Sequence, residues 1–113
     1  MALTQAKATE VENLLNKMKE AGIGGGLLQK DGVVVKATVA LGDTAPTLLT
    51  RVANASDAML QREGNTQKEV EITFGGETIV LVPMATYLFF GIAKTKEEKK
   101  AILEFSKQAE SVL

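Results

Sequence analysis

Apolar residues recur at helical spacing in the first segment of the chain, residues 4–21. Four of them fall on one side of a helical wheel: Val11, Leu14, Leu15 and Met18. Charged and polar residues fill the other side, and Gly22 is suited to the left-handed conformation that ends many helices. The pattern therefore predicts an amphipathic helix whose apolar stripe faces a core.

Two strands joined by a tight turn are predicted after this helix. Residues 24–29 begin with three glycines, and residues 33–40 are rich in β-branched side chains. Between them lies an Asp31-Gly32 pair, a strong hairpin signal because glycine takes a positive φ without strain. A loop over residues 41–46 follows, and its final proline is well placed to open the next helix.

The second predicted helix, residues 47–63, has a wider apolar surface than one sheet requires. One stripe consists of Leu48, Val52, Ala55 and Met59, and the stripe directly beside it consists of Leu49, Ala53, Ser56 and Leu60. Together they span roughly 160° of the helix, whereas packing on one sheet needs a stripe about 100° wide. The excess predicts a second packing partner, in this chain or in another copy. The alternative is that the extra apolar residues are ordinary exposed side chains.

Three further strands are predicted in the second half of the chain. Residues 69–74 alternate between polar and apolar, residues 77–82 are more apolar, and residues 87–93 are apolar on both faces. The pair Gly75-Gly76 is typical of a hairpin turn between the first two of these strands. A break over residues 83–86, beginning with a proline, separates the second strand from the third.

A capping box marks the start of the last predicted helix. Thr95 and Glu98 have the spacing at which the threonine accepts from the backbone and the glutamate reaches back. Apolar residues then align on one side of the helix: Ile102, Phe105, Ala109 and Val112. The predicted order of elements is α-β-β-α-β-β-β-α.

Composition excludes most familiar enzyme chemistry. The 113 residues include no cysteine and no histidine, which excludes disulfides, thiolate metal sites and histidine-dependent catalysis. The net charge of −1 does not suit a dedicated nucleic-acid binder. The glycines of residues 22–26 follow a helix and precede a strand, the reverse of the order in a phosphate-binding loop. We therefore expect no catalytic residue, no cofactor, no metal and no nucleic-acid partner.

Three further features indicate a cytoplasmic protein with a charged sheet edge. Glu69 and Glu71 share one side of a strand; we interpret them as a solvated edge face rather than as paired catalytic acids. The longest uncharged apolar stretch, residues 78–93, contains a proline and is too short to span a membrane. Residues 1–5 lack the basic start and apolar run of a secretory signal. We expect no membrane insertion.

Four features occur in a fixed order along the chain. They are a glycine-rich entry followed by Leu-Leu-Gln-Lys-Asp-Gly-Val-Val at residues 27–34, a second helix rich in small residues, Val-Leu-Val-Pro at residues 80–83, and the closing amphipathic helix. Together they resemble the roadblock (dynein light-chain roadblock) family, a relative of the longin and profilin-like folds. The resemblance covers residues 11–113. The chain departs from it at residues 24–26, three glycines where many relatives carry bulkier side chains.

The resemblance implies one roadblock-like domain over residues 1–113, of the α/β class and α+β type. It implies a five-stranded antiparallel sheet with the second helix on one face and the terminal helices on the other. It also implies a two-fold dimer whose second helices lie side by side and whose third strands pair into one sheet. Such a dimer gives the wide apolar surface of the second helix a cause. The residues expected between the copies are Leu49, Ala53, Ser56, Leu60, Lys68, Val70 and Ile72.

Members of the roadblock family act as non-enzymatic platforms, some for Ras-like small GTPases and others for cargo of dynein. The resemblance therefore implies a homodimeric scaffold or regulator that binds a small GTPase or a complex containing one. The alternatives are a dynein-type light chain or cargo adaptor, and a small-ligand-binding sensory module. The core-facing positions lack the convergent polar groups that a ligand module requires. The residues expected on the partner surface are Arg51, Asn54, Asp57 and Arg62.

Overall fold

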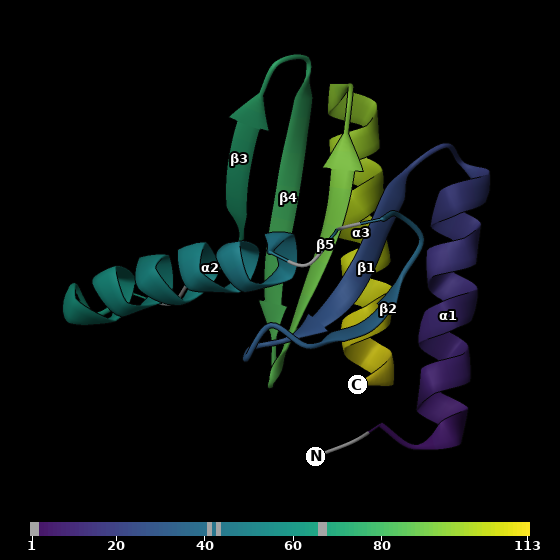
Figure 1. The fold of residues 1–113 in the computed structure, drawn as a ribbon, viewed down its shortest axis with the longest axis horizontal. Coiled ribbons are helices and arrows are strands. Elements are labelled where there is room, and N and C mark those ends of the chain that lie inside the picture. The colour runs from purple at the N-terminus through teal and green to yellow at the C-terminus, as the bar shows by residue number, and fades with distance from the viewer. Residues whose placement is uncertain (1–2, 41, 43, 66–67) are drawn as a thin grey trace.

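The structure is a computed structural model that describes residues 3–40, 42, 44–65 and 68–113. Helices and strands follow one another in the predicted order, α-β-β-α-β-β-β-α, which is confirmed (Figure 1). The elements are α1 (Gln5–Glu20), β1 (Gly24–Gln29), β2 (Val34–Ala37), α2 (Ala45–Arg62), β3 (Val70–Phe74), β4 (Glu77–Met84), β5 (Tyr87–Ala93) and α3 (Lys96–Val112).

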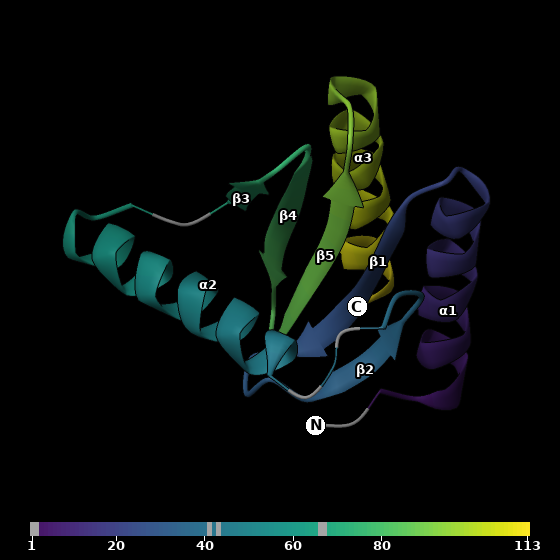
Figure 2. The same cartoon turned by 45° about the horizontal axis from the view of Figure 1, so that its top comes forward.

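The five strands form one antiparallel sheet in the order β2-β1-β5-β4-β3. Because side chains alternate along each strand, the sheet has two apolar faces with separate clusters. One cluster joins α1 and α3 to the strands, through residues such as Leu15, Ile102 and Phe89. The other joins α2 to the strands, through residues such as Leu81 and Phe90. The expected arrangement, with α2 on one face and the terminal helices on the other, is therefore confirmed (Figures 1 and 2).

The glycines at the start of β1 allow α1 to pack closely against this strand and β2 to approach it closely. A Cβ atom added to Gly25 would collide with the Met18 side chain of α1 and with the backbone of β5. A Cβ added to Gly26 would lie 2.7 Å from the Lys36 carbonyl oxygen of β2. Any residue larger than glycine at position 25 or 26 would therefore force its neighbours to move. The departure from the family pattern at residues 24–26 therefore has a structural cause in this chain.

Several element boundaries differ from the sequence-based prediction. Strand β4 continues through Pro83 to Met84, where a break was expected. Pro83 lies beyond the last pair between β3 and β4, Val70 with Leu81, so the proline's missing N–H costs no bond to β3. Strand β2 ends at Ala37, three residues earlier than predicted.

The capping box at the start of α3 forms with one change of partner. The Thr95 hydroxyl accepts from the Glu98 backbone N–H at 3.1 Å, as predicted. The Glu98 carboxylate, however, accepts from the N–H of Lys94, at 2.8 Å, one residue before the cap. Both bonds fix the start of α3 beside the end of β5.

Candidate dimer and partner interface

Helix α2 lies across one end of the sheet, and its C-terminal part extends past β3 (Figures 1 and 2). Four residues of the helix are buried, and all of them belong to its first half: Pro46, Leu49, Thr50 and Ala53. None of residues 54–62 is buried. The first half of α2 therefore anchors the helix, and the second half has little cover from its own chain.

The two apolar stripes of α2 have different environments. Leu49 and Ala53 are only 8% and 3% exposed because they pack against the chain's own sheet. Ser56 and Leu60 continue that stripe and are half-buried. The other stripe, which we call the outer stripe, consists of Leu48, Val52, Ala55 and Met59 and faces away from the sheet. Leu48 is 55% exposed, Val52 43% and Met59 68%.

This arrangement differs from the residue-level expectation for the dimer. Leu49 and Ala53 were expected to contact a second copy, but the chain's own sheet already covers them. The rotation of α2 about its axis decides which stripe meets the sheet, and the sequence leaves that rotation open. Thr50 is buried beside Leu49. Its hydroxyl donates to the Pro46 carbonyl oxygen at 3.1 Å, so the side chain is buried without leaving the hydroxyl group unpaired. The excess apolar surface exists, but on the outer stripe.

The sheet also has a half-covered apolar area on the α2 side. Val70 and Ile72 of β3 and Ile79 of β4 are half-buried and pack at the margin of the α2 cluster. Lys68, which precedes β3, is exposed. The expected interface residues of β3 therefore lie on the same face of the sheet as α2 and retain surface that a partner can cover.

The two edges of the sheet are not equivalent. Strand β2 has four residues, and its pairing with β1 shifts register between Leu27 and Leu28. Strand β3 has five residues and pairs with β4 in unbroken register from Val70 to Phe74. Short strands and bulges discourage pairing at a sheet edge, and β3 lacks both features. Of the two edges, β3 is the one suited to pairing with a further strand.

The face of β3 opposite to α2 carries an ion pair. Glu71 contacts the Lys99 ammonium of α3, and both side chains are roughly one-third exposed. The hydrogen bond from Lys99 to Glu71 raises the pKa of Lys99, while its partial desolvation opposes the shift. The ion pair connects the edge strand to α3 and keeps the Glu71 carboxylate on the α3 side of the sheet.

The four residues expected on the partner surface divide into two groups. Arg51 and Arg62 are exposed and lie roughly 20° apart around α2, beside the outer stripe. Asn54 lies on the side of α2 near the β1–β2 turn, where its side-chain amide donates to the Lys30 carbonyl oxygen at 3.2 Å. Asp57 accepts from the Gln61 amide at 2.8 Å. The two arginines therefore share one side of α2, about 16 Å apart along its axis, and the other two residues lie outside that side.

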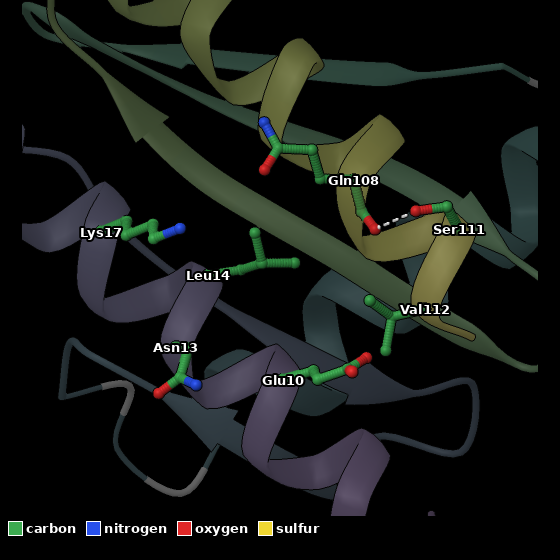
Figure 3. A pocket seen from close by; sticks show the side chains of 7 residues that line it. All are labelled: Glu10, Asn13, Leu14, Lys17, Gln108, Ser111 and Val112. Atoms are coloured by element: carbon green, nitrogen blue, oxygen red, sulfur yellow. Dashed lines mark hydrogen bonds between the residues drawn. The ribbon is translucent and has the colours of Figure 1, made fainter.

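The described residues provide little room for a small molecule between α2 and the sheet. The recess lined by Lys30, Asn54 and Leu88 has a volume of about 10 Å³, the space of roughly one water molecule. A larger groove, about 360 Å³, lies between α1 and α3, with Leu14 and Val112 between polar side chains (Figure 3). That groove is on the opposite face of the sheet from α2.

Comparison with known proteins shows that the fold is the roadblock fold. The chain matches the gliding protein MglB from Thermus thermophilus with a TM-score of 0.75 and 17% sequence identity, over 100% of this chain and 97% of that chain. It matches Myxococcus xanthus MglB with a TM-score of 0.73 and 15% identity, over 100% and 97% of the two chains. A Roadblock/LC7 domain from Streptomyces avermitilis gives a TM-score of 0.75 and 14% identity, over 91% and 94%. The resemblance to roadblock proteins is thus confirmed at the level of the fold.

No family model matches the sequence, and no curated protein matches it. Among the residues that the structure describes, no helix combines the length and apolar character that crossing a membrane requires.

Proposed function

We propose that this chain is a non-enzymatic, homodimeric scaffold of the roadblock type that binds a Ras-like small GTPase or a complex containing one. The proposal treats residues 1–113 as a single roadblock-like domain acting in the cytoplasm. The observation that carries it is the outer stripe of α2, because its large apolar side chains are exposed in a single copy whose edge strand β3 is also unpaired on one side and has no bulge. The roadblock fold of the similar structures supports the same interpretation.

A second copy of the chain is the proposed cover for the outer stripe. If β3 strands from two copies pair, the part of α2 that extends past β3 reaches over the partner's half of the joined sheet (Figure 2). The outer stripes of the two copies then meet each other. This interface removes both the exposed apolar surface and the free strand edge, the two features that a lone copy leaves in water.

The arginines beside the outer stripe form the proposed partner surface. Arg51 and Arg62 project from α2 next to the surface that the second copy covers, so a dimer presents two such pairs. Arginine is enriched at protein interfaces, where its planar group binds carboxylates in a bidentate manner. The family resemblance indicates that a small GTPase is the class of protein that docks there.

Sedimentation equilibrium of the purified chain tests the dimer. We expect the wild type to be dimeric at micromolar concentration and Met59→Asp to be monomeric, because the substitution places a charge in the outer stripe. Ala58→Asp is the matched control: Ala58 is the exposed neighbour of Met59 and lies outside the stripe, so this variant should remain dimeric. A monomeric wild type contradicts the proposal.

Binding of small GTPases tests the partner. We expect a Ras-like GTPase encoded in the same genome, loaded with GDP or a GTP analogue, to bind the dimer in calorimetry. Arg51→Glu combined with Arg62→Glu should weaken binding while the protein stays dimeric, and Lys19→Glu on α1 should leave binding unchanged. Absence of binding by every such GTPase overturns this part of the proposal.

A further inference from the structure

The edge strand β3 has two chemically different faces, and the difference limits how it can pair with a copy of itself. Val70 and Ile72 lie on the α2 side of the sheet, opposite Leu81 and Ile79 of β4. Glu71 lies on the other side, where it contacts Lys99 of α3. Glu69 is also close enough to Lys99 to contribute to its raised pKa. One face of the edge is therefore apolar and the other carries two carboxylates.

Symmetry reduces the possible pairings to a short series. Two antiparallel neighbours in one sheet are related by a two-fold axis perpendicular to the sheet, so each face of the sheet continues unchanged into the partner. Residues that face each other across the axis must then share a face of the strand. It follows that one residue of β3 faces its own copy, with the axis midway between the two, and each choice of that residue defines one register.

Charge excludes the registers centred near the start of the strand. With the axis at Val70, each Glu69 faces Glu71 of the partner subunit. With the axis at Glu71, the two copies of that residue face each other. Like charges directly opposite each other in antiparallel strands are destabilising. Both registers place two carboxylates directly opposite each other, so both are unfavourable for this strand.

The extent of the strand excludes the registers centred near its end. Residues 75–76 form the turn to β4, and Gly75 has a φ of 56°. An axis at Thr73 places Val70 opposite this turn, and an axis at residue 74 leaves more of the strand unpaired. An axis at Ile72 pairs all five residues of β3 and places Glu71 opposite Thr73, a small hydroxyl side chain.

We infer that two copies of this chain pair through β3 with Ile72 opposite Ile72 of the partner subunit, across the two-fold axis, and Glu71 opposite Thr73 of the partner subunit. The inference rests on the proposed dimer and specifies its register. In this arrangement Glu71 keeps its ion pair with Lys99, because that contact is made within one chain. The apolar face of β3 continues into the same face of the partner's strand, on the α2 side of the joined sheet.

Single cysteines report the register directly because the natural chain contains none. Directly opposite residues have Cα atoms about 4.5–5.5 Å apart, within the span of a disulfide, whereas diagonal neighbours are about 7–8 Å apart, beyond it. We expect Ile72→Cys to form a disulfide-linked dimer about tenfold faster than Val70→Cys, Glu71→Cys or Thr73→Cys. A mixture of Glu71→Cys and Thr73→Cys should cross-link about as fast as Ile72→Cys. Asn16→Cys, exposed on α1, measures the rate of random collision.

Each outcome separates the register from the proposed dimer. Fastest cross-linking by Val70→Cys, Glu71→Cys or Thr73→Cys alone overturns the register and leaves pairing through β3 intact. If no β3 variant cross-links faster than Asn16→Cys while sedimentation still shows a dimer, both the register and β3 pairing are wrong. The mixture of two exposed positions keeps the test valid if Ile72→Cys does not fold. A monomeric wild type overturns the proposed dimer itself.

Discussion

Gly91 of β5 lies directly beneath Ile102 of α3. A Cβ atom added to Gly91 would stand 2.7 Å from Cγ1 of Ile102, and both residues are buried. The absence of a side chain at this position lets α3 approach the middle of the sheet, where Ile102 joins the cluster shared with α1. The distance between α3 and the sheet therefore depends on one glycine.

Gly91→Ala should destabilise the protein by about 1–3 kcal/mol, because the added methyl group forces Ile102 or the α3 backbone to move. Gly76→Ala is the control, since a Cβ at Gly76 meets nothing within 4 Å and Gly76 is exposed. Urea unfolding followed by circular dichroism measures both. Equal stability of the two variants would show that α3 can shift at no cost.

The turn between β4 and β5 contains a residue in a strained conformation. Ala85 has a φ of 52°, in the left-handed region that residues with a side chain adopt at a cost. It occupies the first central position of a two-residue hairpin turn, where glycine is preferred. Ala85→Gly should therefore stabilise the protein by about 0.5–1 kcal/mol.

Thr86→Gly is the matched control for this turn, because a glycine at Thr86 adds freedom to the unfolded chain without relieving strain at Ala85. We expect it to be destabilising, by roughly 0.5–1 kcal/mol. Thermal unfolding of the two variants and the wild type gives the comparison. A lower melting temperature for Ala85→Gly than for the wild type is the contrary result.

The Glu71–Lys99 ion pair should make stability depend on alkaline pH. The hydrogen bond to Glu71 raises the pKa of Lys99 above the ordinary value of 10.5. A raised pKa in the folded state means that the contribution is fully present below the ordinary value and is lost as pH rises through the higher folded value. Lys99→Gln should therefore be less stable than the wild type at pH 7–9, and this difference should shrink above a pH of about 10.5.

A double-mutant cycle assigns that effect to the pair. Glu71→Gln should lower stability in the same pH range, and the double variant should lose less than the sum of the two single changes, because the ion pair can be lost only once. Denaturant unfolding at pH 7, 9 and 11 supplies the measurements. A Lys99→Gln difference that stays constant up to pH 11 would show that the lysine acts through packing of its methylene groups instead.

Much of the fold could be predicted from local signals in the sequence. The order of elements follows from the change between helical and alternating patterns. The β1–β2 turn, the β3–β4 turn and the α3 cap each have a short motif. The continuation of β4 through Pro83 could not be predicted this way. Whether a proline interrupts a strand depends on the neighbouring strand at that point, and β3 ends before it reaches Pro83.

The candidate interface shows the same distinction between local and tertiary information. The width of the apolar surface on α2 is a property of the sequence, and it predicted that the helix needs more cover than one sheet supplies. Which stripe remains uncovered depends on how α2 is rotated about its axis on the sheet. Leu48 and Leu49 are both leucines, so residue type does not tell which of them faces the sheet. The structure resolves the two because Leu49 meets the strands and Leu48 faces outward.

Substitutions of the adjacent residues Leu48 and Leu49 should separate effects on monomer stability from effects on dimerisation. Leu49→Asp buries an unpaired charge against Leu81 and Leu88, so it should destabilise the monomer by about 3–5 kcal/mol. Leu48→Asp places the charge on the outer stripe, where water reaches it in a single copy, and should change monomer stability by less than about 0.5 kcal/mol. It should nevertheless abolish dimerisation. Unfolding measured below the dimer's dissociation constant, with sedimentation above it, distinguishes the two effects. A Leu48→Asp variant that remains dimeric would show that the outer stripe lies outside the contact between copies.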